Sequence, residues 1–221
     1  MWLTAGVLSL AGPALAAPGA CDALPWQPLA PGLWLLPAPA SESDAANRGH
    51  SSHLLVARDG ARTWAIGTGA TPRLGQRLRC TVQRHLGRVP TDAWVPWAHA
   101  ELALGSSGLQ AARLWAHERV VQAMAEQCAT CVERLRLRLG DAAVDLGPDP
   151  VRLPTHRLRG EHGRLGPFDW WVLPRAEGRV VTLLRHRGSG VMVAHGLLWG
   201  DGPPDLRDAD LRLLQTALDR L

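Results

Sequence analysis

Residues 53–78 read HLLVARDGARTWAIGTGATPRLGQRL, and this stretch decides the expected fold. Two apolar runs flank the pair Asp59-Gly60, which predicts a β-hairpin. A glycine-rich turn follows. Thr71 and Pro72 then form the N-cap and first-position pattern of a helix, which apolar residues continue at helical spacing. A hairpin that leads into an amphipathic helix indicates a chain of mixed α/β class.

The rest of the chain extends this pattern. Further strands are expected within residues 33–39, 91–99, 151–158, 168–174, 179–186 and 190–199. Helices are expected at 71–87, 118–140 and 206–221, the last with Asp208 as its cap. Consecutive strands that fold back on one another predict a layered mixed domain, not a doubly wound parallel sheet. With no internal repeat and no linker, residues 18–221 are expected to form a single domain.

Residues 1–17, MWLTAGVLSLAGPALAA, contain no charged side chain and end in the small-x-small pattern Ala14-Leu15-Ala16. The apolar run is too short to span a bilayer comfortably. It predicts a signal peptide cleaved near Ala16 or Ala17, in preference to a buried first helix. The mature chain would then be periplasmic or secreted, without a membrane span.

The charge pattern does not favour a nucleic-acid partner. All 24 basic residues are arginine, and they are scattered among acidic residues, as in ERLRLRLGD. Nucleic-acid proteins more often gather basic residues on one face with aromatic platforms. The absence of lysine, together with ten tryptophans, is typical of a GC-rich genome. The basic pI therefore carries little functional weight.

Four cysteines suggest disulfides in an exported protein. Cys128 and Cys131 form a CxxC inside an expected helix, whereas catalytic CxxC pairs lie at helix N-termini. We predict a structural disulfide between these two residues, in preference to a redox or zinc role. Cys21 either pairs with Cys80 or carries a lipid.

Residues 29–78, 95–109 and 190–221 together resemble the metallo-β-lactamase-fold hydrolases. The resemblance is closest to the exported branch called quinoprotein relay system zinc metallohydrolases, and it covers nearly the whole mature chain. It implies an αββα sandwich, in which two mixed sheets are flanked by helices. Relative to that family the chain is expected to be truncated at its C-terminus.

The family begins its two-metal site with an HxHxDH turn, where two metals activate a bridging water. Aligned on the stretch WAHAELALG, this turn falls on Trp97, His99, Glu101 and Leu102. The resemblance therefore implies one retained ligand, His99, and one conservative replacement, Glu101. Trp97 and Leu102 stand where the family has histidines.

Other ligand positions of the family also differ in this chain. Its buried acid aligns with Gly67, and its bridging Asp aligns with Gly196, next to His195. Its third His aligns with Arg164, two residues from His162. Its last His would lie beyond the end of the sequence. No cofactor is therefore expected.

Two functions follow from the resemblance. The preferred one is a non-catalytic or accessory homologue, linked to periplasmic quinoprotein oxidation. In it, the groove near Trp97, Leu102 and Trp199 would bind a small molecule or a periplasmic protein. The alternative is a hydrolase with one zinc, since catalytic zinc needs three protein ligands. Its ligands would come from His99, Glu101, His162 and His195, with Glu101 as ligand or general base.

Overall fold

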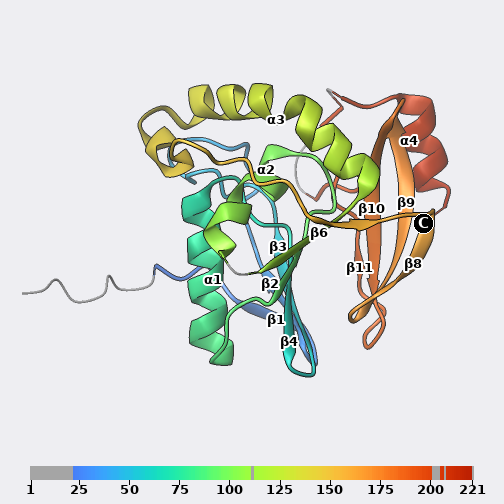
Figure 1. Ribbon diagram of the computed structural model, residues 1–221, viewed down its shortest axis with the longest axis horizontal. Helices are drawn as coiled ribbons and strands as arrows, with labels where there is room; N and C mark the ends of the chain where they lie inside the picture. Colours follow the sequence, from blue (N-terminus) through green and yellow to red (C-terminus); the bar gives the residue numbers. More distant parts are fainter. Residues whose placement is uncertain (1–21, 111, 201–204, 207, 221) are drawn as a thin grey trace, which may run out of the picture.

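The computed structural model describes residues 22–110, 112–200, 205, 206 and 208–220 (Figure 1). Seven strands form the first sheet, in chain order: β1 (Gln27–Ala30), β2 (Leu33–Leu36), β3 (Leu54–Asp59), β4 (Arg62–Ile66), β5 (Asp92–Trp94), β6 (Arg113–His117) and β7 (His156–Leu158). Four strands form the second, in the order β11 (Met192–Val193), β10 (Arg179–His186), β9 (Phe168–Ala176), β8 (His162–Leu165). The predicted mixed α/β class with two sheets is confirmed.

The hairpin and helix predicted from residues 53–78 are both present. β3 and β4 pair antiparallel up to Asp59 opposite Arg62. α1 (Pro72–Leu86) then crosses over to β5, which lies parallel to β4. The Thr71 hydroxyl caps α1 by accepting a hydrogen bond from the Leu74 N–H at 3.1 Å. Parallel strands require a crossover connection, and α1 provides the one between β4 and β5.

Helices cover the outer faces of both sheets (Figure 1). The apolar side of α1 packs on β3, β4 and β5 of the first sheet. α4 (Leu211–Leu218) packs on β9 and β10 of the second. The inner faces share one core with α3 (Glu118–Leu139), which includes the buried Trp64, Trp94, Phe168 and Trp170. The layers therefore run helix, sheet, sheet, helix.

Several local predictions were wrong. Asp210, not Asp208, caps α4: its carboxylate accepts hydrogen bonds from the N–H groups of Arg212 (2.9 Å) and Leu213 (3.1 Å). β6 and β8 were not predicted, because each is short and lacks a clear alternation of apolar residues. The chain also forms α2 (Ala100–Ala103) and the 3₁₀ segments η1 (Leu104–Leu109) and η2 (Gly140–Leu146).

The predicted disulfide between Cys128 and Cys131 is also wrong, because both side chains are free thiols on α3. Cys128 faces the core, and burial raises the pKa of its thiol to about 12. Cys80 on α1 is disulfide-bonded. Cys21 and the predicted signal peptide at 1–17 lie outside the described residues.

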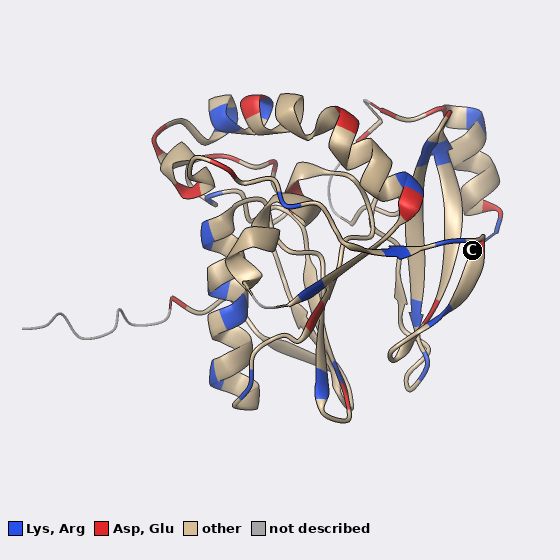
Figure 2. Ribbon diagram, in the orientation of Figure 1, with Lys and Arg blue, Asp and Glu red and all other residues tan. Residues whose placement is uncertain are grey.

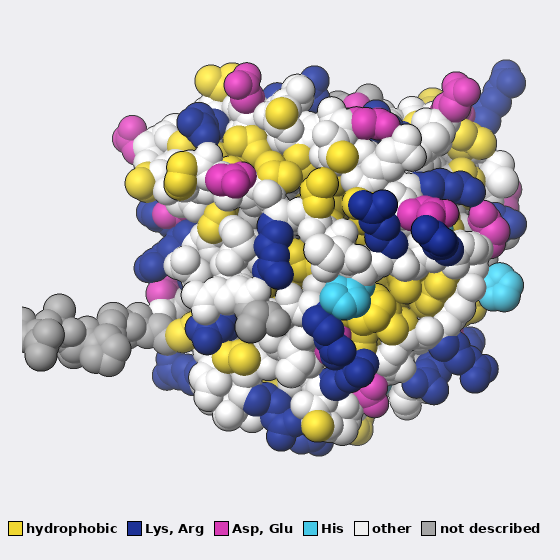
Figure 3. Space-filling model, in the orientation of Figure 1, with side chains coloured by type: hydrophobic (Ala, Val, Ile, Leu, Met, Phe, Trp, Pro, Cys, Tyr) yellow, Lys and Arg dark blue, Asp and Glu magenta, His cyan; other side chains and the backbone are white. Residues whose placement is uncertain are grey.

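Charged residues are mixed on the surface. Arginines and acidic residues are spread over both sheets and most helices, whereas α1 carries arginines and no acidic residue (Figure 2). On the face shown in Figure 3, arginine side chains are separated by acidic, apolar and neutral ones. Within the described ranges, no helix is long and apolar enough to cross a membrane.

Candidate functional site

The stretch WAHAELALG joins the two sheets. It follows β5, and Trp97 forms an isolated antiparallel bridge with Val181 of β10. The N–H of Thr182 donates to the Pro96 carbonyl at 2.7 Å. α2 then begins, with His99 at its N-cap position. The region that the resemblance assigns to metal ligands therefore also connects the layers of the sandwich.

His99 lies between two carboxylates. Its Nδ1 forms an ion pair with Glu101, and its Nε2 lies 3.2 Å from Oδ2 of Asp205. The Ser43 hydroxyl donates to the other oxygen of Glu101 at 3.1 Å. The Glu101 residue is only 6% exposed. Three segments distant in sequence thus meet at the ion pair of His99 and Glu101.

These contacts fix the charge of both partners. Burial by itself would lower the pKa of His99, but the negative charges of Glu101 and Asp205 outweigh it and raise this pKa to about 9. Burial would raise the pKa of Glu101, but the His99 charge and hydrogen bonds from His99 and Ser43 lower it to about 2. At neutral pH the site therefore holds an imidazolium between carboxylates.

Trp97 extends this cluster toward β9. Its ring stacks on His99, with centroids 4.1 Å apart and planes inclined by 18°. The guanidinium of Arg175 lies 4.4 Å from the Trp97 ring centroid and 5.5 Å from that of Trp199. Arg175 is 1% exposed and donates to the carbonyl oxygens of Gly196 and Asp205. The expected groove residues Trp97 and Trp199 thus flank a buried cation.

Apolar residues close the positions where the resemblance expects acids. A Cβ atom at Gly67 would lie 2.9 Å from the side chain of Leu102. A Cβ atom at Gly196 would lie 2.9 Å from the ring of Trp97. Both glycines have positive φ, which other residues rarely adopt. Leu102 and Trp97 therefore use the space that acids at Gly67 and Gly196 would need.

No family model matches the chain, but solved structures do. It resembles a metallo-β-lactamase from Pontibacter korlensis, with a TM-score of 0.66 and 13% identity over 89% of this chain and 84% of that one. For the metallo-β-lactamase FIM-1 from Pseudomonas aeruginosa, in its mono-zinc form, the TM-score is 0.67 and the identity is 15%, over 90% of this chain and 82% of that one. For a metallo-β-lactamase from Hirschia baltica, the TM-score is 0.67 and the identity is 9%, over 90% of this chain and 84% of that one. The chain has the metallo-β-lactamase fold.

A curated sequence relative covers less of the chain. Over 127 residues, 56% of this chain, the sequence is 32% identical to a probable DNA ligase of Anaeromyxobacter sp. (strain K). The match covers 25% of that ligase. The description as a ligase therefore concerns a protein that this chain matches over only a quarter of its length.

The other two candidate ligands, His195 and His162, have contacts of their own away from the ion pair of His99 and Glu101. His195 contacts the carbonyl oxygen of His53 through Nε2 at 2.9 Å. His162 lies exposed on β8, opposite Trp171 of β9. In the part of the chain that the structure describes, no three His, Cys, Asp or Glu side chains could hold a metal. The predicted four-residue ligand set is not assembled.

Sequence reasoning missed Ser43, Arg175 and Asp205. The one available signal was Arg175, a charged residue in the apolar run FDWWVLPRA, where a buried arginine requires partners. Ser43 and Asp205 carried no local signal. Their role depends on how far-apart segments meet at His99.

Three histidines with shifted pKa values predict a stability maximum near pH 6.5. Burial lowers the pKa of His50 and of His195 to about 4, so the unfolded chain binds more protons as pH falls from 6.5. The raised pKa of His99 acts in the opposite direction: its contribution is complete below 6.5 and is lost as pH rises through about 9. Urea unfolding across pH 4–10 measures the free energy of unfolding at each pH. His195→Gln should make the decrease in stability below pH 6.5 less steep. A monotonic rise in stability to pH 10 would contradict the expectation.

Proposed function

We propose that this chain is a non-catalytic protein of the metallo-β-lactamase fold that acts by binding or as an accessory factor. The observation that supports this most strongly is His99, whose two ring nitrogens both face carboxylates. A metal-bound imidazole must offer a nitrogen lone pair. Zinc at His99 would therefore require loss of a proton from a group whose pKa is raised to about 9, together with loss of an ion pair.

The surrounding residues support the same proposal. Trp97 and Leu102 occupy space next to Gly196 and Gly67, so acidic ligands could not be accommodated there without repacking. Arg175 places a positive charge beside Trp97, which disfavours a divalent cation nearby. The chemistry of the donor set thus does not fit the zinc centre of the family. We infer that the site now holds the scaffold together.

Metal analysis of the purified mature chain tests the proposal. After incubation with zinc and dialysis, we expect less than stoichiometric metal, unchanged in His99→Ala. The matched control is His162→Ala, which alters an exposed histidine on β8. His99→Ala should lower the thermal midpoint, whereas His162→Ala should not. Stoichiometric zinc that disappears in His99→Ala would overturn the proposal and favour the alternative, a hydrolase with an atypical single metal.

We also propose that the chain is exported and works beside periplasmic quinoprotein oxidation. Residues 1–17 support export, and the family resemblance supports the link to quinoproteins. Fractionation and N-terminal sequencing should find a periplasmic chain cleaved after Ala16 or Ala17. Deleting the gene should slow growth on an alcohol that a quinoprotein oxidises, and the unaltered gene should restore it. Unchanged growth would contradict the proposed link to quinoprotein oxidation.

A further inference from the structure

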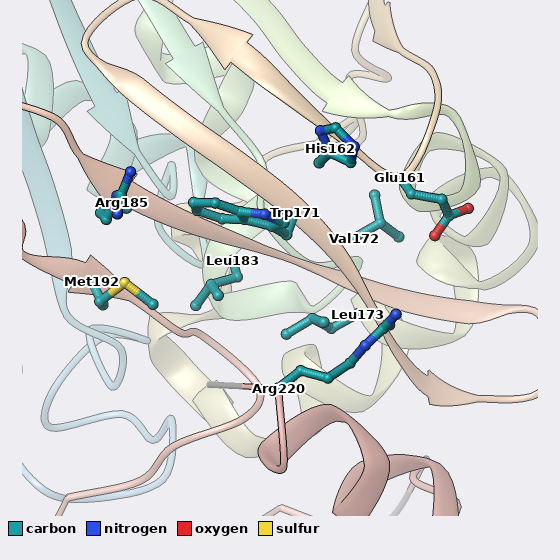
Figure 4. A pocket seen from close by; sticks show the side chains of 9 residues that line it. All are labelled: Glu161, His162, Trp171, Val172, Leu173, Leu183, Arg185, Met192 and Arg220. Atoms are coloured by element: carbon teal, nitrogen blue, oxygen red, sulfur yellow. The ribbon is translucent and has the colours of Figure 1, made fainter.

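A cavity lies on the outer face of the second sheet, beside α4 and away from His99. Its volume is about 450 Å³, within the range of roughly 300–1,000 Å³ typical of small-molecule sites. Trp171 and Leu173 of β9 and Leu183 of β10 form its apolar surface, with Met192 of β11 (Figure 4). We call it the β9–β10 cavity.

Strand alternation produces this apolar surface. Trp171 and Leu173 are two positions apart on β9, and Leu183 pairs directly with Trp171 across β10. All three therefore point to the same side of the sheet. α4 packs against Leu173 and Leu183, which are 4% and 3% exposed, while Met192 remains 43% exposed. α4 thus covers one part of this face of the second sheet, and the cavity lies beside the helix.

Arginines at the rim give the β9–β10 cavity its charge. The guanidinium of Arg185 lies 5.5 Å from the Trp171 ring centroid and donates to Asp169 at 2.7 Å, which holds it in place. Arg220 follows α4 and extends beside Leu173 (Figure 4). Among the described residues, Arg220 makes no side-chain ion pair. It is therefore available for an anion.

Asp169 pairs with Arg185, but no described acidic residue that lines this cavity pairs with Arg220. Glu161 is the one acidic residue that lines the cavity, and it already pairs with Arg119 at 3.1 Å. His162, opposite Trp171, adds a ring that can donate a hydrogen bond. An adjoining cavity of about 370 Å³ shares His162, Trp171 and Arg185. The combined surface has an apolar floor, and its edge carries Arg220 together with the Arg185–Asp169 ion pair.

We propose that the β9–β10 cavity binds a small molecule with a flat apolar ring and one acidic group. The ring lies against Trp171 and Met192, where it removes exposed apolar surface from water. The acidic group pairs with Arg220. A carboxylate and a sulfonate share this chemistry. The assignment does not depend on the His99 site or on its metal content.

Two matched dyes test the proposal on the mature chain. The probe 8-anilino-1-naphthalenesulfonate has flat rings and an acid, and N-phenyl-1-naphthylamine has the same rings without the acid. We expect saturable fluorescence enhancement with the sulfonate at native pH and temperature. Arg220→Ala should weaken its binding about 5- to 10-fold, as expected for loss of one charge-assisted contact. Binding of the neutral dye should stay unchanged.

Two further variants control this result. Arg212→Ala removes an exposed arginine of α4 that does not line the cavity, and it should leave both dyes unaffected. Trp171→Leu keeps an apolar side chain but removes the ring, so it should weaken both dyes. Equal effects of Arg220→Ala and Arg212→Ala would overturn the proposal. So would sulfonate binding that falls as protein concentration rises, because a second copy of the chain would then cover this face.

Discussion

Gly105→Ala is expected to destabilise the chain by about 3 kcal/mol or more, because the added Cβ atom would overlap the carbonyl oxygen of Thr68. Gly105 is buried in η1, and its N–H donates to the carbonyl of Gly69 at 2.7 Å. Its own carbonyl occupies the space that a Cβ atom on Gly75 of α1 would take. Three backbone segments meet here without intervening side chains, so none can move to relieve the overlap.

Urea and thermal unfolding measure this effect. For a chain of this size, a loss of 3 kcal/mol corresponds to a fall of about 6–12 °C in the thermal midpoint. Gly200→Ala is the matched control, because a Cβ atom there meets nothing within 4 Å and its φ is not in the left-handed region. It should change stability by less than about 0.5 kcal/mol. Similar losses in both variants would show that the close approach is not the cause.

Glu101→Ala should cost about 3–5 kcal/mol, the range found when one partner of a buried ion pair is removed. The variant leaves the His99 imidazolium with Asp205 alone and removes the acceptor of the Ser43 hydroxyl. Without Glu101, the pKa of His99 should fall from about 9, because its largest favourable interaction is gone. The alkaline decline in stability should therefore move to lower pH.

Glu118→Ala provides the comparison. Glu118 pairs with Arg159 at 3.1 Å, but both side chains are exposed, so its loss should change stability by about 1 kcal/mol or less. It should leave the pH dependence of unfolding unchanged. The interpretation of the His99 cluster would be wrong if Glu101→Ala cost no more than Glu118→Ala, or if its alkaline decline stayed near pH 9.

Much of the fold was predictable from local sequence signals. The Asp59-Gly60 turn, the Thr71 cap and the Pro72 start act over a few residues, and each appears as expected. Longer strands with clear apolar character, such as β9 and β10, were also found. Short strands such as β6 and β8 were missed, because pairing with neighbours stabilises them and local pattern does not.

The candidate site was predictable only in part. The motif singled out His99 and Glu101 as candidate ligands, and the structure joins them in an ion pair at the start of α2. The motif could not place His162, which lies on β8 next to Trp171. Nor could it show that Cys128 and Cys131 remain free thiols.

The sequence by itself determined the mixed α/β class and the hairpin and helix of residues 53–78, since these depend on short-range chemistry. Tertiary structure alone decided what His99 does. Its partner Asp205 belongs to a distant C-terminal segment, and Ser43, which donates to Glu101, lies 58 positions before that residue, so only folding brings these charges and hydrogen bonds together. The β9–β10 cavity arises in the same way, because strand pairing and the placement of α4 set Arg220 beside Trp171.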